Sequence, residues 1–150
     1  MRITSFFFIF SFFFVQAEAY SQTHINPTLS NTDIVLQFFE GVNQPEKIQA
    51  SLDLLTDDYK FTNPMVSLSS KVEFINLMME IGKVVTEVEM LHTSEEGDWV
   101  ATFYIFKSNV PGVESNYASE WFRIENGKIQ ESKMIYDATK WRAIYAQMGE

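Results

Sequence analysis

The hydrophobic pattern of the chain changes near Gly82 from a mainly helical period to a mainly strand-like one, and this change constrains the fold more than any other feature. Before Gly82, apolar residues recur every three or four positions, as they do on one face of an α-helix. After it, apolar and polar residues alternate, which is typical of strands with one covered face. Helices followed by strands predict an α+β domain, in which two or three N-terminal helices cover one face of a curved antiparallel meander.

Two or three N-terminal helices are expected, because the second of the three candidate segments is short. The first begins near Asn31, where Ser30 or Asn31 itself can accept hydrogen bonds from the backbone N–H groups of the first turn. The second is short and begins at Pro45, and the third follows a capping box formed by Ser70 and Glu73. Their apolar stripes are, in order, Ile34, Val35, Phe38, Phe39 and Val42; Ile48, Leu52 and Leu55; and Phe74, Leu77, Met78 and Ile81.

The strands are marked by alternation and by turn residues. A first strand, residues 59–63, ends before Pro64, because proline interrupts a regular ladder. Asn126-Gly127 predicts a tight hairpin between the last two strands, because both residues tolerate positive φ. A final helix, "ATKWRAIYAQM", follows, and Asp137 is expected to cap its first turn. The remaining strands are expected in 84–90, "WVATFYIFK", "NYASEWFRI" and "KIQESKMIYD".

The N-terminus has the pattern of a signal peptide. Arg2 precedes an apolar run from Phe6 to Val15, and a small-residue site, Ala17 to Ala19, follows. The run is about half as long as the roughly 20 apolar residues that a membrane-spanning helix needs. We therefore expect residues 1–19 to be cleaved after Ala19, residues 20–30 to be a flexible leader and residues 31–150 to be the domain. The mature protein is expected to be secreted or periplasmic, with no stable membrane anchor.

Charge and residue usage exclude several classes of function. The net charge is −9, and it stays −9 after cleavage because residues 1–19 contain one cation and one anion. Such a charge repels nucleic acid. The chain has no cysteine, which excludes thiol nucleophiles and thiolate metal sites. Its two histidines, His24 and His92, lack metal-ligand spacing, and no phosphate loop or dinucleotide fingerprint occurs, so we expect no metal and no cofactor.

Three stretches of the sequence resemble the nuclear transport factor 2-like superfamily, in particular its SnoaL-like and ketosteroid isomerase-like branches. They are "FFEGVNQPEKIQASLDLLTDDYKFTNP", the hairpin "EWFRIENGKIQESKMIYD" and the tail "ATKWRAIYAQMG". The resemblance covers residues 31–150 and implies a cone-shaped domain, in which the bent sheet wraps around a cavity that the helices close. It also implies a homodimer, because open sheets in this superfamily often pair.

The isomerase pattern implies three polar roles in such a cavity, of which this chain keeps one. Asn63 stands where the isomerases have a general-base aspartate, and an amide cannot take up a proton near neutral pH. Phe39 stands where they have a tyrosine donor. Glu120 stands where they have a second, protonated carboxylic acid. The departures at Asn63 and Phe39 argue against steroid isomerisation.

Glu120 has two expected environments, and the length of the hairpin loop decides between them. A two-residue loop, Asn126-Gly127, places Glu120 opposite Lys133 as a cross-strand ion pair. A three-residue loop places it opposite Ser132, on a mostly apolar face that would raise its pKa. We favour the second register because it separates the charged residues onto the other face. The neighbours of Glu120 on its own face would then be Ala118, Phe122, Met134 and Tyr136.

Asn63 also has two interpretations. Its amide can orient a carbonyl or carboxylate group of a ligand. Alternatively, it ends a strand and starts a turn, which is the commoner role of asparagine before proline. The expected pocket therefore combines Glu120, as a candidate catalytic acid or base, with the following residues: Phe39, Asn63, Ala118, Phe122, Met134 and Tyr136.

Three functions follow as alternatives. The first is the binding of a small, partly apolar or carbonyl-bearing molecule without chemistry. The second is a cofactor-free isomerase, cyclase or hydrolase that uses Glu120 as acid or base. The third is an interaction module that pairs through its outer sheet face. The missing aspartate favours binding over catalysis.

Overall fold

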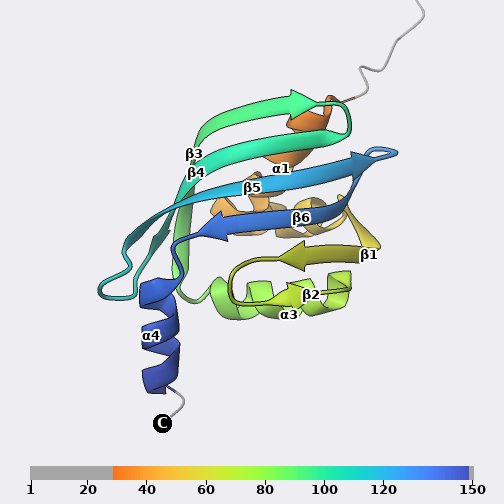
Figure 1. Ribbon diagram of the computed structural model, residues 1–150. Helices are drawn as coiled ribbons and strands as arrows, with labels where there is room; N and C mark the ends of the chain where they lie inside the picture. The colour runs from red at the N-terminus through yellow and green to blue at the C-terminus, as the bar shows by residue number, and fades with distance from the viewer. Residues whose placement is uncertain (1–28, 149–150) are drawn as a thin grey trace, which may run out of the picture.

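Most helices precede Gly82 and the four long strands follow it, as the change of hydrophobic period predicts, while β1 and β2 lie between α2 and α3, and α4 ends the chain (Figure 1). The computed structural model describes residues 29–148. The expected signal peptide and all but the last two residues of the expected leader lie outside them. The elements are α1 (Asn31–Asn43), the 3₁₀ helix η1 (Pro45–Lys47), α2 (Ile48–Leu52), β1 (Leu55–Thr62), β2 (Ser67–Leu68), α3 (Lys71–Ile81), β3 (Val85–Glu96), β4 (Trp99–Ser108), β5 (Ser115–Glu125), β6 (Lys128–Tyr136) and α4 (Thr139–Met148).

The strands form one curved, mostly antiparallel sheet with the order β2-β1-β6-β5-β4-β3. Strands β3 to β6 make the expected meander. Strand β1 joins it parallel to β6, a pairing that the sequence pattern does not predict. Helix α1 packs on β3 and β4 and α3 packs on β1, while α4 stands at one end of the sheet (Figure 1). The expected α+β architecture, with helices over one face of a curved sheet, is confirmed.

Local sequence explains where the helices begin. The Ser30 hydroxyl accepts from the Asp33 N–H at 3.1 Å, and the Asp33 carboxylate accepts in return from the Ser30 N–H at 3.1 Å, which completes a capping box for α1. At α3 the Ser70 hydroxyl accepts from the Glu73 N–H at 3.3 Å. The Glu73 carboxylate accepts instead from the Ser69 N–H, at 2.7 Å, so the capping box expected there is displaced by one residue.

Several boundaries differ from the expected ones: β1 begins four residues earlier than the strand expected at 59–63, and β3 extends to Glu96 instead of ending near Met90. Leu55 does not extend the apolar face of the second helix, because α2 ends at Leu52 and Leu55 opens β1. The N–H of Ile129 donates to the carbonyl of Leu54 at 2.8 Å, so contact with β6 begins at this point. Pairing with a distant strand outweighs the local helical spacing.

No helix within residues 29–148 is long and apolar enough to cross a membrane.

The register of the β5–β6 hairpin matches neither of the two expected registers. Glu125 pairs with Lys128, so the loop is Asn126-Gly127, with φ values of 52° and 73°. A bulge at Gln130 then shifts the pairing and places Glu120 opposite Met134. The three-residue loop is therefore wrong. The face it predicted is nevertheless right, because the true register differs from the favoured one by two residues and side chains alternate with a period of two.

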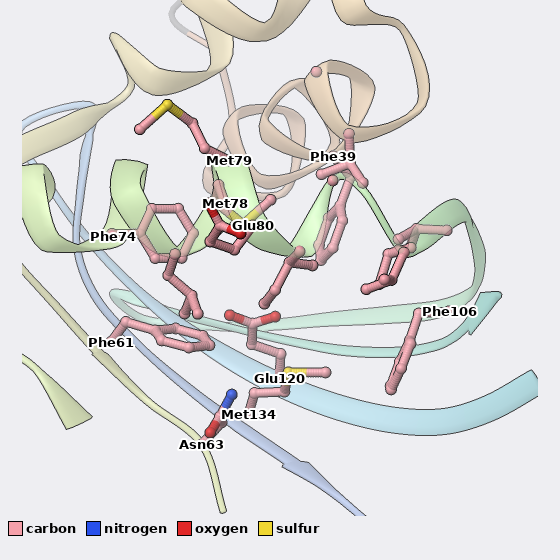
Figure 2. Close-up of a pocket in the computed structure, with 18 of the residues that line it drawn as sticks. Phe39, Phe61, Asn63, Phe74, Met78, Met79, Glu80, Phe106, Glu120 and Met134 are labelled. Carbon is pink, nitrogen blue, oxygen red and sulfur yellow. The ribbon is translucent and has the colours of Figure 1, made fainter. Parts of the chain in front are cut away.

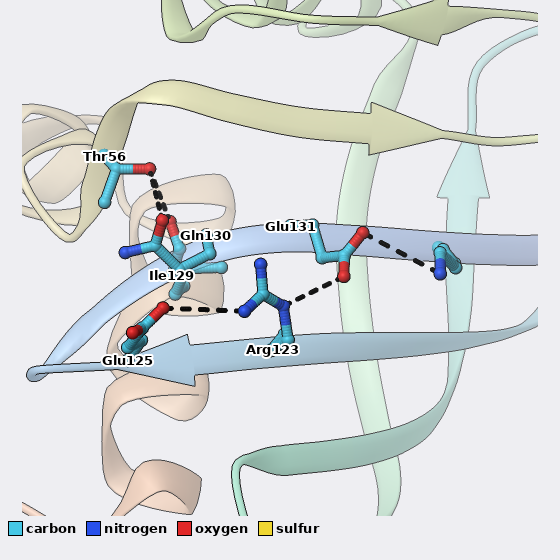
Figure 3. A network of polar contacts seen from close by, with 7 residues as sticks. Thr56, Arg123, Glu125, Ile129, Gln130 and Glu131 are labelled. Carbon is cyan, nitrogen blue, oxygen red and sulfur yellow. Dashed lines mark hydrogen bonds and ion pairs between the residues drawn. The ribbon is translucent and has the colours of Figure 1, made fainter.

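Polar contacts on the outer face accompany the bulge (Figure 3). The hydroxyl of Thr56, on β1, lies 3.4 Å from the Gln130 side-chain oxygen. The Arg123 guanidinium donates to the Glu131 carboxylate at 2.9 Å across the hairpin and also lies 3.5 Å from Glu125. These charged side chains lie on the face opposite Glu120, so they do not neutralise it.

Candidate functional site

A cavity of about 810 Å³ lies between the inner face of the sheet and the helices α1 and α3 (Figure 2). Its wall is mostly apolar and rich in rings and thioethers, including Phe39, Phe61, Phe74, Phe106, Met78 and Met134. The rim includes exposed groups, among them Pro45 on η1 and Met79 and Glu80 on α3. A volume and lining of this kind are typical of sites for small organic ligands.

The carboxyl group of Glu120 stands on the floor of this cavity (Figure 2). Alternation along β5 turns Glu120 inward, and the residue is 4% exposed. The Tyr104 hydroxyl, on the neighbouring strand β4, donates to Oε2 at 2.8 Å. The Ser132 hydroxyl, on β6, donates to Oε1 at 2.6 Å. Both oxygens therefore have one hydroxyl donor from the protein.

A third hydroxyl extends this arrangement into the core. Tyr59, which is fully buried on β1, lies with its hydroxyl 2.6 Å from the Ser132 hydroxyl oxygen. Because the single Ser132 proton is donated to Glu120, Tyr59 must be the donor to Ser132. The result is a directed chain from Tyr59 through Ser132 to Glu120. Tyr59 and Ser132 lie behind the carboxyl group and do not line the cavity.

Burial dominates the electrostatics of this group. It raises the pKa of Glu120 to about 6, although the hydrogen bonds from Ser132 and Tyr104 act in the opposite direction. Burial, and secondarily the nearby Glu120 carboxylate, raises the pKa values of Tyr59 and Tyr104 well above that of a free tyrosine. Both tyrosines therefore stay protonated and remain donors while Glu120 titrates.

Asn63 has the turn-forming role that its position before Pro64 predicts. Its side-chain oxygen accepts from the backbone N–H groups of Met65 and Val66, at 2.8 and 2.9 Å. The amide nitrogen is on the cavity side, toward Glu120 (Figure 2). Within residues 29–148, that nitrogen donates no hydrogen bond. Asn63 thus ends the strand and also presents one donor to the cavity.

The structure brings together five of the seven residues expected at the site. Phe39, Asn63, Glu120, Met134 and Tyr136 all line the cavity. Ala118 and Phe122 do not: they share the inner face of β5 with Glu120 but are buried in the core. Phe122, for example, is 0% exposed and packs its ring edge-on against Phe38 and Phe39, at centroid distances of 5.7 and 5.6 Å.

Of the three hydroxyl groups that support Glu120, only Ser132 was expected beside it, and Tyr104 and Tyr59 were not predicted from the sequence. Tyr104 had a usable signal, because it lies on the inward-facing alternation of β4 next to the strand that carries Glu120. Ser132 was expected directly opposite Glu120, but the bulge at Gln130 places it opposite Phe122, from where it still donates to Glu120. Tyr59 depended on the parallel pairing of β1 with β6. Neither a bulge nor a long-range strand pairing leaves a clear local pattern in this chain.

The only charged residues that line the cavity within the described chain are Glu80 and Glu120, and both are acidic. Glu80 is exposed at the rim and pairs with Lys83 at 2.7 Å. Residues 29–148 contain no group of three or more acidic or histidine side chains that could hold a metal ion. The chemistry available at the floor is therefore that of one buried carboxyl group and its hydroxyl donors.

Comparison with protein families identifies this architecture. The model of the SnoaL-like domain matches residues 35–132. The chain belongs to the SnoaL-like domain family. The resemblance to the nuclear transport factor 2-like superfamily is thereby confirmed, and a search of curated proteins finds no significant match.

Solved structures with this fold come from several bacteria. A nuclear transport factor 2-like protein of unknown function from Cytophaga hutchinsonii is 21% identical, with a TM-score of 0.66, over 81% of this chain and 99% of its own. A putative polyketide cyclase from Sinorhizobium meliloti is 16% identical, with a TM-score of 0.62, over 71% and 99%. A putative hydroxylase from Streptomyces galilaeus is 16% identical, with a TM-score of 0.62, over 78% and 96%. At these identities the likeness concerns the fold alone.

Proposed function

We propose that this SnoaL-like domain binds a small, largely apolar organic molecule in its cavity, with Glu120 as the polar anchor. One observation carries the proposal: a buried carboxyl group, held by two hydroxyl donors, stands on the floor of an otherwise apolar cavity of about 810 Å³. Burying a carboxyl group costs free energy, so its position facing an open cavity is better explained by a ligand than by stability. The names of two structural neighbours, a putative polyketide cyclase and a putative hydroxylase, are consistent with small organic ligands.

We also propose that the protein acts outside the cytoplasm, in the periplasm or the medium. The apolar run and small-residue site of residues 1–19 support this location. N-terminal sequencing of the exported protein should begin at Tyr20. An uncleaved N-terminus, or a protein retained with the cytoplasmic fraction, would contradict it.

A cavity-filling variant tests the binding proposal. Leu77 lines the cavity, whereas Leu36 lies on the exposed side of α1. N-phenyl-1-naphthylamine, an uncharged probe that fluoresces in apolar surroundings, should bind the wild-type protein and Leu36→Trp, and should bind Leu77→Trp at least ten-fold more weakly. Circular dichroism should show that all three are folded. Failure of the probe to bind, or equal binding by the three proteins, would overturn the proposal.

Acid–base catalysis is the second candidate, and the pKa of Glu120, raised by burial to about 6, is the observation that favours it. A carboxyl group with such a pKa can accept and return a proton near neutral pH, as an isomerase, cyclase or hydrolase would require. Exchange of the α-protons of 2-tetralone in D₂O, followed by NMR, should be faster with wild-type protein than with Glu120→Gln. Equal rates would remove Glu120 from this reaction.

We further propose that the outer sheet face pairs with a second copy of the chain. This face exposes Phe103, Tyr117, Trp121 and Ile135, and the first two rings are stacked at 5.7 Å. It also carries both signs of charge, so the same face of a second copy is complementary to it. Light scattering should give a dimer for the wild-type protein and a monomer for Trp121→Glu, and a monomeric wild-type protein would contradict the proposal.

A further inference from the structure

We propose that the occupant of the cavity is a lipophilic amine, bound as its ammonium ion, with Glu120 as the counter-ion. This inference rests on the proposed binding function and specifies the chemical class of the ligand. It distinguishes amines from the uncharged carbonyl compounds and the organic acids that an apolar cavity of the same size would otherwise accept.

The distribution of charge around the cavity is the first argument. Glu120 lies on the floor and Glu80 on the rim, and no lysine, arginine or histidine lines the cavity within residues 29–148. The whole chain has a net charge of −9. Glu80 is paired with Lys83 at 2.7 Å, so the uncompensated charge of the cavity is that of Glu120. An anionic ligand would meet like charge on the floor, whereas a cation would be attracted to it.

The hydrogen bonding of Glu120 is the second argument. Its two oxygens each accept one hydroxyl from the protein, at 2.8 Å from Tyr104 and 2.6 Å from Ser132. A carboxylate oxygen has two lone pairs, so each keeps one free for a further donor. An ionised carboxylate accepts hydrogen bonds and cannot donate them. The ligand group that hydrogen-bonds to the free lone pairs of the carboxylate must therefore be a donor, and an ammonium group has three N–H donors.

The hydroxyl donors favour the ionised form over the neutral one. Tyr104 and Ser132 are arranged to donate, and Tyr59 supports Ser132 from behind at 2.6 Å. These hydrogen bonds act against the burial that raises the pKa of Glu120. A cation in the cavity would form an ion pair with the buried carboxylate and so offset the free-energy cost of burying its charge. An uncharged ligand would deepen the burial and favour proton uptake instead.

The aromatic wall is the third argument. Phe39, Phe61, Phe74 and Phe106 surround the space above the carboxyl group (Figure 2), and the Phe39 ring lies 5.0 Å from that of Tyr104. Aromatic rings attract organic cations electrostatically and bury apolar groups at the same time. The amide nitrogen of Asn63, on the cavity side, offers one more donor, which suits a hydroxyl or carbonyl oxygen elsewhere on the ligand.

Three probes of the same shape test this inference by isothermal titration calorimetry at pH 7.5: 2-(1-naphthyl)ethylamine, 2-(1-naphthyl)ethanol and 1-naphthylacetate. The wild-type protein should bind the amine at least ten-fold more tightly than the alcohol, and the acetate most weakly. Glu120→Gln should reduce the ratio of amine to alcohol affinity to about one while it keeps the affinity for the alcohol. Glu46→Gln, on the exposed surface of η1, makes the same change of charge and should keep the wild-type ratio.

The outcomes separate this inference from the proposed function. Binding of the alcohol as tight as that of the amine would overturn the amine assignment and leave the cavity as a site for uncharged molecules. Amine selectivity that persists in Glu120→Gln would also overturn it, because the selectivity would then come from elsewhere. Failure of all three probes to bind would contradict both proposals. If Glu120→Gln does not fold, binding of the alcohol by the wild-type protein as tightly as the amine still overturns the amine assignment.

Discussion

At the scale of single residues, the site depends on how one carboxyl group is held. Glu120 is buried, yet within residues 29–148 its carboxylate has no ion pair and no cation lines its cavity. Hydroxyl groups from three other strands support it: Tyr104 and Ser132 directly, and Tyr59 through Ser132. Hydroxyl donors can stabilise a carboxylate without cancelling its charge. The group therefore remains available to a ligand in a way that a salt-bridged glutamate does not.

Glu120 should make the stability of the protein depend on pH. Its folded pKa of about 6 exceeds the value of an unfolded glutamate, so the folded state binds the proton more tightly. The resulting stabilisation is fully present below the unfolded pKa and is lost as the pH rises through about 6. The tyrosines that face the group, Tyr104 and Tyr59, stay protonated throughout this range.

Guanidinium unfolding of wild-type protein and Glu120→Gln across this range measures the effect. Relative to Glu120→Gln, the wild-type protein should lose about 2 kcal/mol of unfolding free energy between about pH 4 and about pH 8. Glu46→Gln, at an exposed position, serves as the control. A difference between wild type and Glu120→Gln that does not change with pH would show that the carboxyl group is not desolvated.

Ser132→Ala should raise the pKa of Glu120 further. The Ser132 hydroxyl lowers that pKa by donating to the carboxylate, and alanine cannot replace the donor. NMR titration of the side-chain carboxyl carbon gives the value directly. Ser119→Ala removes a hydroxyl from the opposite face of the same hairpin and should leave the pKa unchanged. A lower or unchanged pKa in Ser132→Ala would contradict the hydroxyl chain.

At the scale of elements, the helices and the meander follow from local patterns, whereas their exact registers do not. The apolar stripe of α1 predicts which of its residues are buried, and Asn126-Gly127 predicts the hairpin. The bulge at Gln130 and the parallel pairing of β1 depend on partners far along the chain. The face of β5 that carries Glu120 was predictable because it follows from alternation alone. Of its hydroxyl partners, Ser132 was expected from the favoured register and Tyr104 could have been found from the alternation of β4. Tyr59 could not, because it depends on the long-range pairing of β1 with β6.

Two substitutions in α1 test the assignment of its buried face. Phe38 is 6% exposed and contacts the rings of Phe39, Phe74 and Phe122, whereas Leu36 is 38% exposed. Phe38→Ala should lower the unfolding free energy by about 3 to 5 kcal/mol, because it leaves a cavity in the core. Leu36→Ala should lower it by less than about 1 kcal/mol. Equal effects in chemical denaturation would show that the helix is rotated from the orientation described.

At the scale of the whole molecule, the curved sheet separates two surfaces with different chemistry. Its inner face, together with α1 and α3, encloses the apolar cavity and the Glu120 carboxyl group. Its outer face carries the exposed rings. The same face carries the charged residues around Arg123, which Figure 3 shows. The sequence predicts this separation through strict alternation on β4 and β5. The volume of the cavity and the set of residues that line it depend on how the helices close over the sheet, which no local pattern specifies.

A ligand that occupies the cavity should stabilise the entire fold. Because α1, α3 and the sheet all line the cavity, an occupant binds the native state and not the unfolded chain. A hundred-fold excess of 2-(1-naphthyl)ethylamine over its dissociation constant should add about 2.7 kcal/mol to the unfolding free energy. The gain should disappear in Leu77→Trp and persist in Leu36→Trp. An equal gain in both variants would place the bound probe outside the cavity.

The pKa of Glu120 is the measurement that tests the account most directly. Carbon-detected NMR titration of the mature protein should give a value of about 6. The same value should be found in Lys133→Met, because Lys133 is exposed on the other face and Glu120 lies opposite Met134. A value at or below about 4.3, the ordinary figure for a glutamate, that rises when Lys133 is removed would mean a surface ion pair. In that case the cavity would have no acid on its floor, and both the anchor role of Glu120 and the amine assignment would fail.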